Sequence, residues 1–91
     1  MEIFVTLTFE RQAKKLHKNQ KHILDQVIRA IAENPDSGES KKADLLGISV
    51  YKFLIGNQEW LLAYRILSKN SIKLLLVGPH ENFYRNLKRK K

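Results

Sequence analysis

The sequence predicts an α+β fold, with two helices packed on one face of a mainly antiparallel sheet. Two patterns support this prediction. A period of two recurs near the start of the chain and over 50–67, as in strands, and residues 72–77 form an apolar run that suits a central strand. Between residues 20 and 33 apolar residues fall instead at helical spacing. The predicted order is β-α-α-β-β-β-α, and we expect the 91 residues to form one domain, 1–91.

The N-terminal part predicts one strand and two helices. The segment 2–9 alternates and is rich in β-branched and aromatic residues, which is typical of a strand. Thr8 is expected to cap a short basic helix over residues 10–18. An amphipathic helix is expected over 20–33. Pro35 ends it, because the residue before a proline avoids the helical region.

The C-terminal part predicts a meander of strands followed by a helix. Three strands are expected, over residues 50–55, 60–67 and 72–77. The tight turns between them make neighbouring strands antiparallel. The first strand of the chain then adds at an edge of this meander or between its strands. A final helix is expected from about residue 81 to 88.

Alternation along the strands sorts side chains onto two faces of the sheet. One face is expected to lie under the helices and carries Tyr51, Phe53, Ile55, Trp60, Leu62 and Tyr64. The other face is expected to stay open and to present Lys52 and Arg65, with Leu54, Leu61 and Ala63 between them. Cations on an open sheet face suit a phosphate backbone. Two isolated cations can equally be ordinary solvent-facing residues.

The positive charge is concentrated in the second half of the chain. The net charge is +8, from 17 basic and 9 acidic side chains. Residues 51–91 hold nine basic and two acidic side chains, net +7, against +1 for residues 1–50. This asymmetry favours an anionic partner, with nucleic acid or a ribonucleoprotein first. The alternative is a lysine-rich surface that only aids solubility.

Several classes of protein are excluded or disfavoured. The chain has no cysteine, which excludes a disulfide scaffold, a thiolate metal site and a cysteine nucleophile. His17 and His22 lack the spacing of a helical metal pair, and no phosphate-binding glycine loop occurs. We therefore expect no metal and no cofactor. The sequence shows no signal peptide. It also shows no apolar run as long as the roughly 20 residues that a membrane helix needs. We therefore expect no membrane partner and a cytoplasmic location.

The segment from residue 77 to 85 has the densest set of chemically useful side chains. It follows a predicted strand and opens a helix. His80 carries an imidazole that can donate or accept a proton, and Tyr84 lies four residues on, on the same side of a helix. Arg85 adds a cation, and Phe83 or Tyr84 can stack on a base. These groups suit RNA cleavage without a metal. Equally, His80 can cap the helix while both aromatic rings pack inside.

Three segments together resemble the RelE/ParE superfamily of bacterial toxins. They are Val50-Tyr51-Lys52-Phe53, the strand from Trp60 to Arg65, and the stretch from Val77 to Tyr84. The resemblance covers nearly the whole chain and implies a microbial-ribonuclease-like α+β fold. RelE-type members enter the ribosomal A site and cut mRNA, leaving a 2′,3′-cyclic phosphate and a 5′-hydroxyl, and a cognate antitoxin neutralises them. ParE-type members share the fold and inhibit DNA gyrase instead.

The resemblance also assigns roles to residues. Lys52 matches a basic strand position of RelE-like nucleases, His80 a position that holds arginine or histidine, and Tyr84 an aromatic that stacks on the mRNA base or assists catalysis. Leu54 and Leu61 stand where a second lysine and an arginine are expected. The sequence therefore leaves either a histidine-centred nuclease or a ParE-like toxin without nuclease activity.

The first hypothesis is a toxin of a type II toxin–antitoxin system that acts as a ribosome-dependent mRNA endoribonuclease. His80 would be the general acid or base, Lys52 and Arg65 would stabilise phosphate charge, and Tyr84 would position the base. RNA and ribosome binding is assigned to Arg85, Phe83, Lys88, Arg89, Lys90 and Lys91. The expected partners are a cognate antitoxin and the ribosome with its mRNA. The alternative is a ParE-like toxin that binds DNA gyrase and cuts no RNA.

Overall fold

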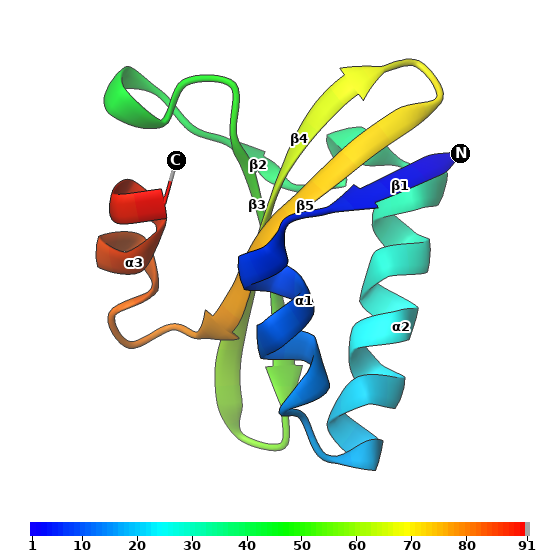
Figure 1. Ribbon diagram of the computed structural model, residues 1–91, viewed down its shortest axis with the longest axis vertical. Helices are drawn as coiled ribbons and strands as arrows, with labels where there is room; N and C mark the ends of the chain where they lie inside the picture. The colour runs from blue at the N-terminus through cyan, green and yellow to red at the C-terminus, as the bar shows by residue number, and fades with distance from the viewer. Residues whose placement is uncertain (91) are drawn as a thin grey trace.

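The computed structural model describes residues 1–90 and shows a twisted sheet between two helical layers (Figure 1). Two single-turn 3₁₀ helices, Pro35–Ser37 and Ala43–Leu45, lie in the long connection before the meander. The helices and strands are β1 (Glu2–Val5), α1 (Leu7–Lys14), α2 (Lys18–Glu33), β2 (Glu39–Ser40), β3 (Ser49–Ile55), β4 (Gln58–Ser68), β5 (Ser71–Pro79) and α3 (Phe83–Lys90). No helix within residues 1–90 is long and apolar enough to cross a lipid bilayer.

The sheet confirms the predicted α+β class and meander. Its five strands have the order β1-β5-β4-β3-β2, and β3, β4 and β5 are antiparallel neighbours. The first strand lies at an edge, where it runs parallel to β5 with Ile3 opposite Ile72. The short strand β2 was not predicted, and it closes the other edge by pairing Glu39 with Val50.

The first strand is shorter than the sequence predicts, and the predicted cap at Thr8 is wrong. Thr6 caps α1 instead, because its hydroxyl accepts a hydrogen bond from the Phe9 backbone N–H at 3.0 Å. The same hydroxyl donates to the Leu75 carbonyl oxygen on β5 at 2.8 Å. A side chain that bonds to both the helix and the neighbouring strand ends β1 at Val5 and draws Phe9 into the helix.

Helices α1 and α2 cover one face of the sheet, as predicted, and Figure 1 shows them on the same side. Leu24 and Ile31 of α2 and Phe9 of α1 are buried against Trp60 and Leu62 of β4. The helical spacing of the α2 residues gives that helix an apolar stripe, and burying the stripe against the sheet drives the packing.

The prediction that the other sheet face stays open is wrong. Helix α3 lies against this face, on the side away from α1 and α2 (Figure 1). Phe83 and Leu87, one helical turn apart, are buried against Leu61 and Ala63, both 0% exposed. Two large apolar side chains at this spacing form an apolar stripe on α3, and burying this stripe against the sheet favours the packing of α3.

Tyr64 connects the sheet to the chain that precedes β2. Its ring is buried, and its hydroxyl donates to the Pro35 carbonyl oxygen at 2.5 Å and accepts from the Gly38 N–H at 3.0 Å. A Cβ atom on Gly38 would lie 2.5 Å from the Tyr64 hydroxyl oxygen, so only glycine fits there. Burial raises the pKa of Tyr64. These contacts fix where Glu39 and the residues after it lie.

Candidate functional site

The sheet register brings several polar side chains to one corner of the face that carries α3. In the β3–β4 hairpin, Lys52 is paired with Leu61, and Leu54 with Glu59. Directly paired residues of antiparallel strands point to the same side, so Lys52 and Glu59 share a face. The strand β5 ends at this corner, where His80 follows it. We use the name corner cluster for Glu39, Lys41, Lys52, Glu59, His80 and Tyr84.

His80 is held beside Glu59 by two contacts. The backbone N–H of His80 donates to the carbonyl oxygen of Glu59 at 2.9 Å. The side chains approach to 3.7 Å between His80 Nε2 and Glu59 Oε1. Both are accessible, with 57% of the His80 side chain and 43% of the Glu59 side chain exposed. At this corner the His80 imidazole is therefore exposed to solvent and lies beside a carboxylate that can orient it. The imidazole can donate or accept a proton.

Tyr84 links His80 to a lysine from a distant part of the chain. Its ring meets the His80 ring edge-on, with 6.4 Å between centroids. The Lys41 Nζ lies 5.0 Å from the centroid of the Tyr84 ring, within range of a cation–π interaction. The half-buried Tyr84 ring thus connects the imidazole with an ammonium group in this corner.

The charges of the corner are unevenly paired. Lys41 forms an ion pair with the Glu39 carboxylate, and this hydrogen bond is the main cause that raises the pKa of Lys41 and lowers the pKa of Glu39. The positive charge of Lys52 also lowers the Glu39 pKa, more weakly. Within residues 1–90, Lys52 has no ion-pair partner. Its exposed ammonium group is available to an anion.

The comparisons with known proteins decide the family. A model of the ParE-like toxin of type II bacterial toxin–antitoxin systems matches residues 3–88. The chain belongs to this toxin family. No curated protein sequence matches it significantly.

Two solved structures resemble this ParE-like toxin in fold. The isolated E. coli RelE toxin aligns with a TM-score of 0.69 and 15% identity, over 97% of this chain and 96% of that one. The toxin–antitoxin complex RelBE of E. coli aligns with a TM-score of 0.63 and 15% identity, over 85% of this chain and 93% of that one. The family match confirms the predicted RelE/ParE superfamily, and the two structures confirm the predicted fold.

Three of the four catalytic residues predicted for the toxin lie in the corner cluster: Lys52, His80 and Tyr84. The structure does not bring Arg65 to them. At roughly 3.4 Å per residue, Arg65 lies about 20 Å from Glu59 along β4. There it is paired with Lys73 of β5. Any role of Arg65 toward RNA is therefore separate from the corner.

The residues predicted to bind RNA or the ribosome are placed differently from one another. Phe83 is 2% exposed and packs in the core, so its ring cannot stack on a base as predicted. Lys88 lies 3.9 Å from the Asp44 carboxylate. Arg85, Arg89 and Lys90 are exposed on α3, and Lys91 lies outside the described residues.

Sequence reasoning missed three members of the corner cluster. Glu59 had a usable signal, because it stands two residues before Leu61 on the same strand and therefore shares the face of Lys52. Glu39 and Lys41 had none, since Glu39 lies in the two-residue strand β2 and Lys41 directly after it, where the path of the chain depends on Tyr64. Within residues 1–90, no three histidine or carboxylate side chains are grouped to hold a metal.

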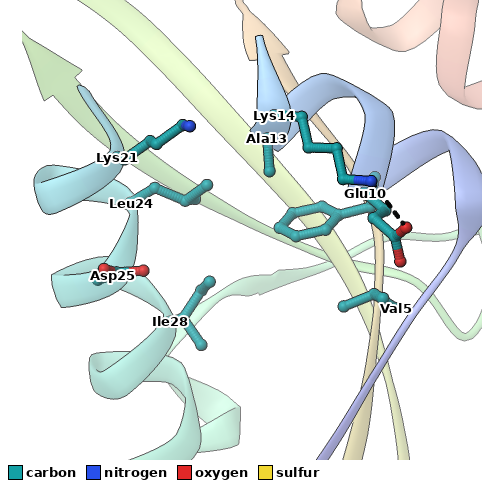
Figure 2. A pocket seen from close by; sticks show the side chains of 9 residues that line it. Val5, Glu10, Ala13, Lys14, Lys21, Leu24, Asp25 and Ile28 are labelled. Atoms are coloured by element: carbon teal, nitrogen blue, oxygen red, sulfur yellow. Dashed lines mark ion pairs between the residues drawn. The ribbon is translucent and has the colours of Figure 1, made fainter. Parts of the chain in front are cut away.

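A second feature of the toxin is an apolar hollow of about 360 Å³ between α1 and α2 (Figure 2). Phe9, Ala13, Leu24 and Ile28 line it, together with Val5 from the edge strand. Charged residues stand at its rim, including the ion pair of Glu10 and Lys14 and the side chains of Lys21 and Asp25. The hollow contains no histidine and suits apolar contact rather than catalysis.

Proposed function

We propose that this toxin inhibits translation as a ribosome-dependent mRNA endoribonuclease, and that the corner cluster cuts the RNA. The observation that carries the proposal is the accessible contact between His80 and Glu59, beside Tyr84 and the exposed Lys52. An exposed acid–base side chain next to an accessible cation is what phosphodiester cleavage needs. The RelE-like fold supports the same reading.

The reaction is an internal transesterification. The 2′-oxygen of one nucleotide attacks the adjacent phosphorus, the bond to the 5′-oxygen breaks, and a 2′,3′-cyclic phosphate and a 5′-hydroxyl form. The 2′-hydroxyl loses a proton to a base, and the leaving 5′-oxygen gains one from an acid. His80 can take either role, Lys52 stabilises the charge that builds on the phosphorane, and Tyr84 stacks on the base. Glu59 orients the imidazole and is a positioning residue.

Variants of single residues test this function on ribosomes programmed with an mRNA. His80→Gln should lower the cleavage rate about 10²–10⁴-fold, the usual contribution of a general acid or base. Ribosome binding by this variant should stay unchanged. The matched control is His22→Gln on the exposed surface of α2, which should cut normally. Wild-type cleavage by His80→Gln would contradict the proposed mechanism.

The second candidate function is inhibition of DNA gyrase by binding. It is favoured by the ParE-like family and by Leu54 and Leu61, which replace two cations expected of RelE-like nucleases. Leu61 is fully buried under α3, and Leu54 is 64% exposed, an apolar surface beside Lys52. A supercoiling assay with purified gyrase decides between the two. The nuclease proposal expects no inhibition, whereas ParE-like action expects inhibition that His80→Gln leaves intact.

We also propose that a cognate antitoxin binds this toxin, as the RelBE neighbour supports. Strand β1 forms an edge of the sheet, and its Ile3, Phe4 and Val5 are 42–47% exposed. This apolar strand is continuous with the hollow of Figure 2, because Val5 belongs to the strand and also lines the hollow. Co-expression with a small reading frame adjacent to the toxin gene, where one is found, tests the proposal. Val5→Glu should reduce co-purification, whereas Leu46→Glu, at an exposed apolar residue outside the hollow, should not.

A further inference from the structure

Besides the apolar hollow of Figure 2, a hollow lined partly by polar side chains lies on the α3 face of the sheet, away from the corner cluster. It has a volume of about 200 Å³ and shares no lining residue with that cluster. Its polar side chains come from four elements or their junctions: Thr6 and Thr8 at the start of α1, Arg65 of β4, Lys73 of β5, and Lys90 in the last turn of α3. A hollow of this size is smaller than a typical site for a drug-sized ligand and suits one compact group.

Three cationic side chains line this hollow, and no acidic residue is among its lining. Arg65 and Lys73 are paired directly across β4 and β5, where like charges normally repel. Lys90 adds a third charge from α3. None of the three forms an ion pair within residues 1–90. An anion bound between them would relieve the repulsion.

The backbone around Arg65 leaves room for its guanidinium group. A Cβ atom on Gly47 would lie 2.7 Å from Arg65 Nη1, and Gly47 has a φ of +87°, which favours glycine. A register shift in the β4–β5 ladder falls between Ala63 and Tyr64, just before Arg65. Such bulges redirect side chains next to functional sites. The guanidinium group of Arg65 therefore lies beside Gly47, in space that a side chain at that position would fill.

We propose that Arg65, Lys73 and Lys90 form a phosphate-binding pocket that holds the RNA backbone apart from the scissile bond. The inference rests on the proposed nuclease function and deepens it. Tyr84 stands in the first turn of α3 and Lys90 in the last, about 9 Å apart at 1.5 Å per residue. The helix thus joins the corner cluster to the pocket. A phosphate held in the pocket fixes the RNA relative to His80.

The test combines Arg65→Gln, Lys73→Gln and Lys90→Gln in one variant. The control variant combines Arg11→Gln, Lys15→Gln and Lys18→Gln, which removes the same charge from exposed positions on and beside α1 and α2. Equal thermal stability of both variants shows that the fold is retained. Binding is measured with a fluorescein-labelled single-stranded RNA, with 70S ribosomes lacking mRNA, and with poly-glutamate, each at several salt concentrations.

The pocket variant should bind RNA or ribosomes at least tenfold more weakly, and the control variant within about twofold of wild type. In the oligonucleotide arm, the slope of log affinity against log salt should fall by roughly 0.7 for each RNA phosphate that the variant no longer neutralises. A loss of affinity confined to that arm assigns the phosphate to mRNA, and a loss with ribosomes assigns it to ribosomal RNA.

Three results would overturn the pocket: equal losses of affinity in both variants, no loss in either, or a loss confined to poly-glutamate, which would assign it to an acidic protein segment. Cleavage is measured in parallel, so that the two proposals can fail separately. If the wild type cuts mRNA and the pocket variant binds RNA like the control, the pocket alone is wrong. If the pocket variant loses RNA binding but the wild type cuts nothing, the nuclease function alone is wrong.

Discussion

At the scale of single residues, the contact between His80 and Glu59 carries the chemistry that we propose. The carboxylate lies 3.7 Å from the imidazole and is itself accessible. An imidazole on a chain segment just after a strand has rotational freedom unless a second group orients it. Glu59 supplies that group from the neighbouring strand, and the backbone bond from His80 to Glu59 keeps the two residues together.

Glu59→Gln should therefore lower the turnover of mRNA cleavage about tenfold and leave the KM for programmed ribosomes nearly unchanged. The reason is that Gln keeps the shape of the side chain but removes the charge that orients the imidazole. A merely structural role would leave the pH–rate profile in place, so the profile is the deciding readout. An unchanged profile and turnover would remove Glu59 from the mechanism. Glu81→Gln, at an exposed position nearby in sequence, is the control.

A second residue-scale prediction concerns Tyr64. Tyr64→Phe should cost roughly 1–3 kcal/mol of unfolding free energy, because the Pro35 carbonyl and the Gly38 N–H lose their buried partner. Burial raises the pKa of Tyr64, so the folded state holds its proton more tightly than the unfolded state. Stability is then complete below about pH 10 and falls as the pH rises above it. Urea titrations at pH 7 and pH 11 should show a smaller alkaline loss of stability for the Phe variant.

At the scale of elements, α3 determines which of the two leucines, Leu54 or Leu61, can be replaced by the cationic residue expected of RelE-like nucleases. Leu61 is buried beneath α3, whereas Leu54 is exposed on the same sheet face. Leu61→Arg should cost about 3–5 kcal/mol, because it places an unpaired charge in the core. Leu54→Lys should change stability by under about 0.5 kcal/mol, since it replaces an exposed side chain. It should also raise cleavage by adding a cation beside Lys52.

Thermal denaturation and the ribosome cleavage assay check this pair. A stable, active Leu61→Arg variant would show that α3 does not cover the sheet as described. A Leu54→Lys variant that cuts no faster than wild type would show that the exposed part of this face does not contact the scissile phosphate.

The elements were predictable where a single periodicity governs them. The alternation over 50–67, the apolar run over 72–77 and the apolar stripe of α2 predicted the meander and the helix-covered face. The cap at Thr6 was not predictable, because its second hydrogen bond reaches Leu75, 69 residues away in sequence. The cover of the second face was missed because the stripe of Phe83 and Leu87 is only two residues long. Within the site, Lys52, His80 and Tyr84 were predictable from their places along the strands and from the family resemblance. The position of Lys41 was not, because it depends on long-range contacts.

At the scale of the whole molecule, two separate groups of cationic side chains lie on one face. The corner cluster holds Lys41 and Lys52, and the pocket under the end of α3 holds Arg65, Lys73 and Lys90. The opposite layer carries the apolar hollow between α1 and α2 (Figure 2). In our account the α3 face meets RNA, while the edge strand and the hollow meet the antitoxin.

The most direct test of the central claim is the chemistry of the RNA ends left on ribosomes programmed with a defined mRNA. We predict that the wild-type protein cuts the message within the A site. The downstream fragment should carry a 5′-hydroxyl that polynucleotide kinase labels without prior phosphatase treatment, and the upstream fragment a 2′,3′-cyclic phosphate. His80→Gln should give neither fragment. An intact message, or fragments with 5′-phosphate ends, would contradict the account.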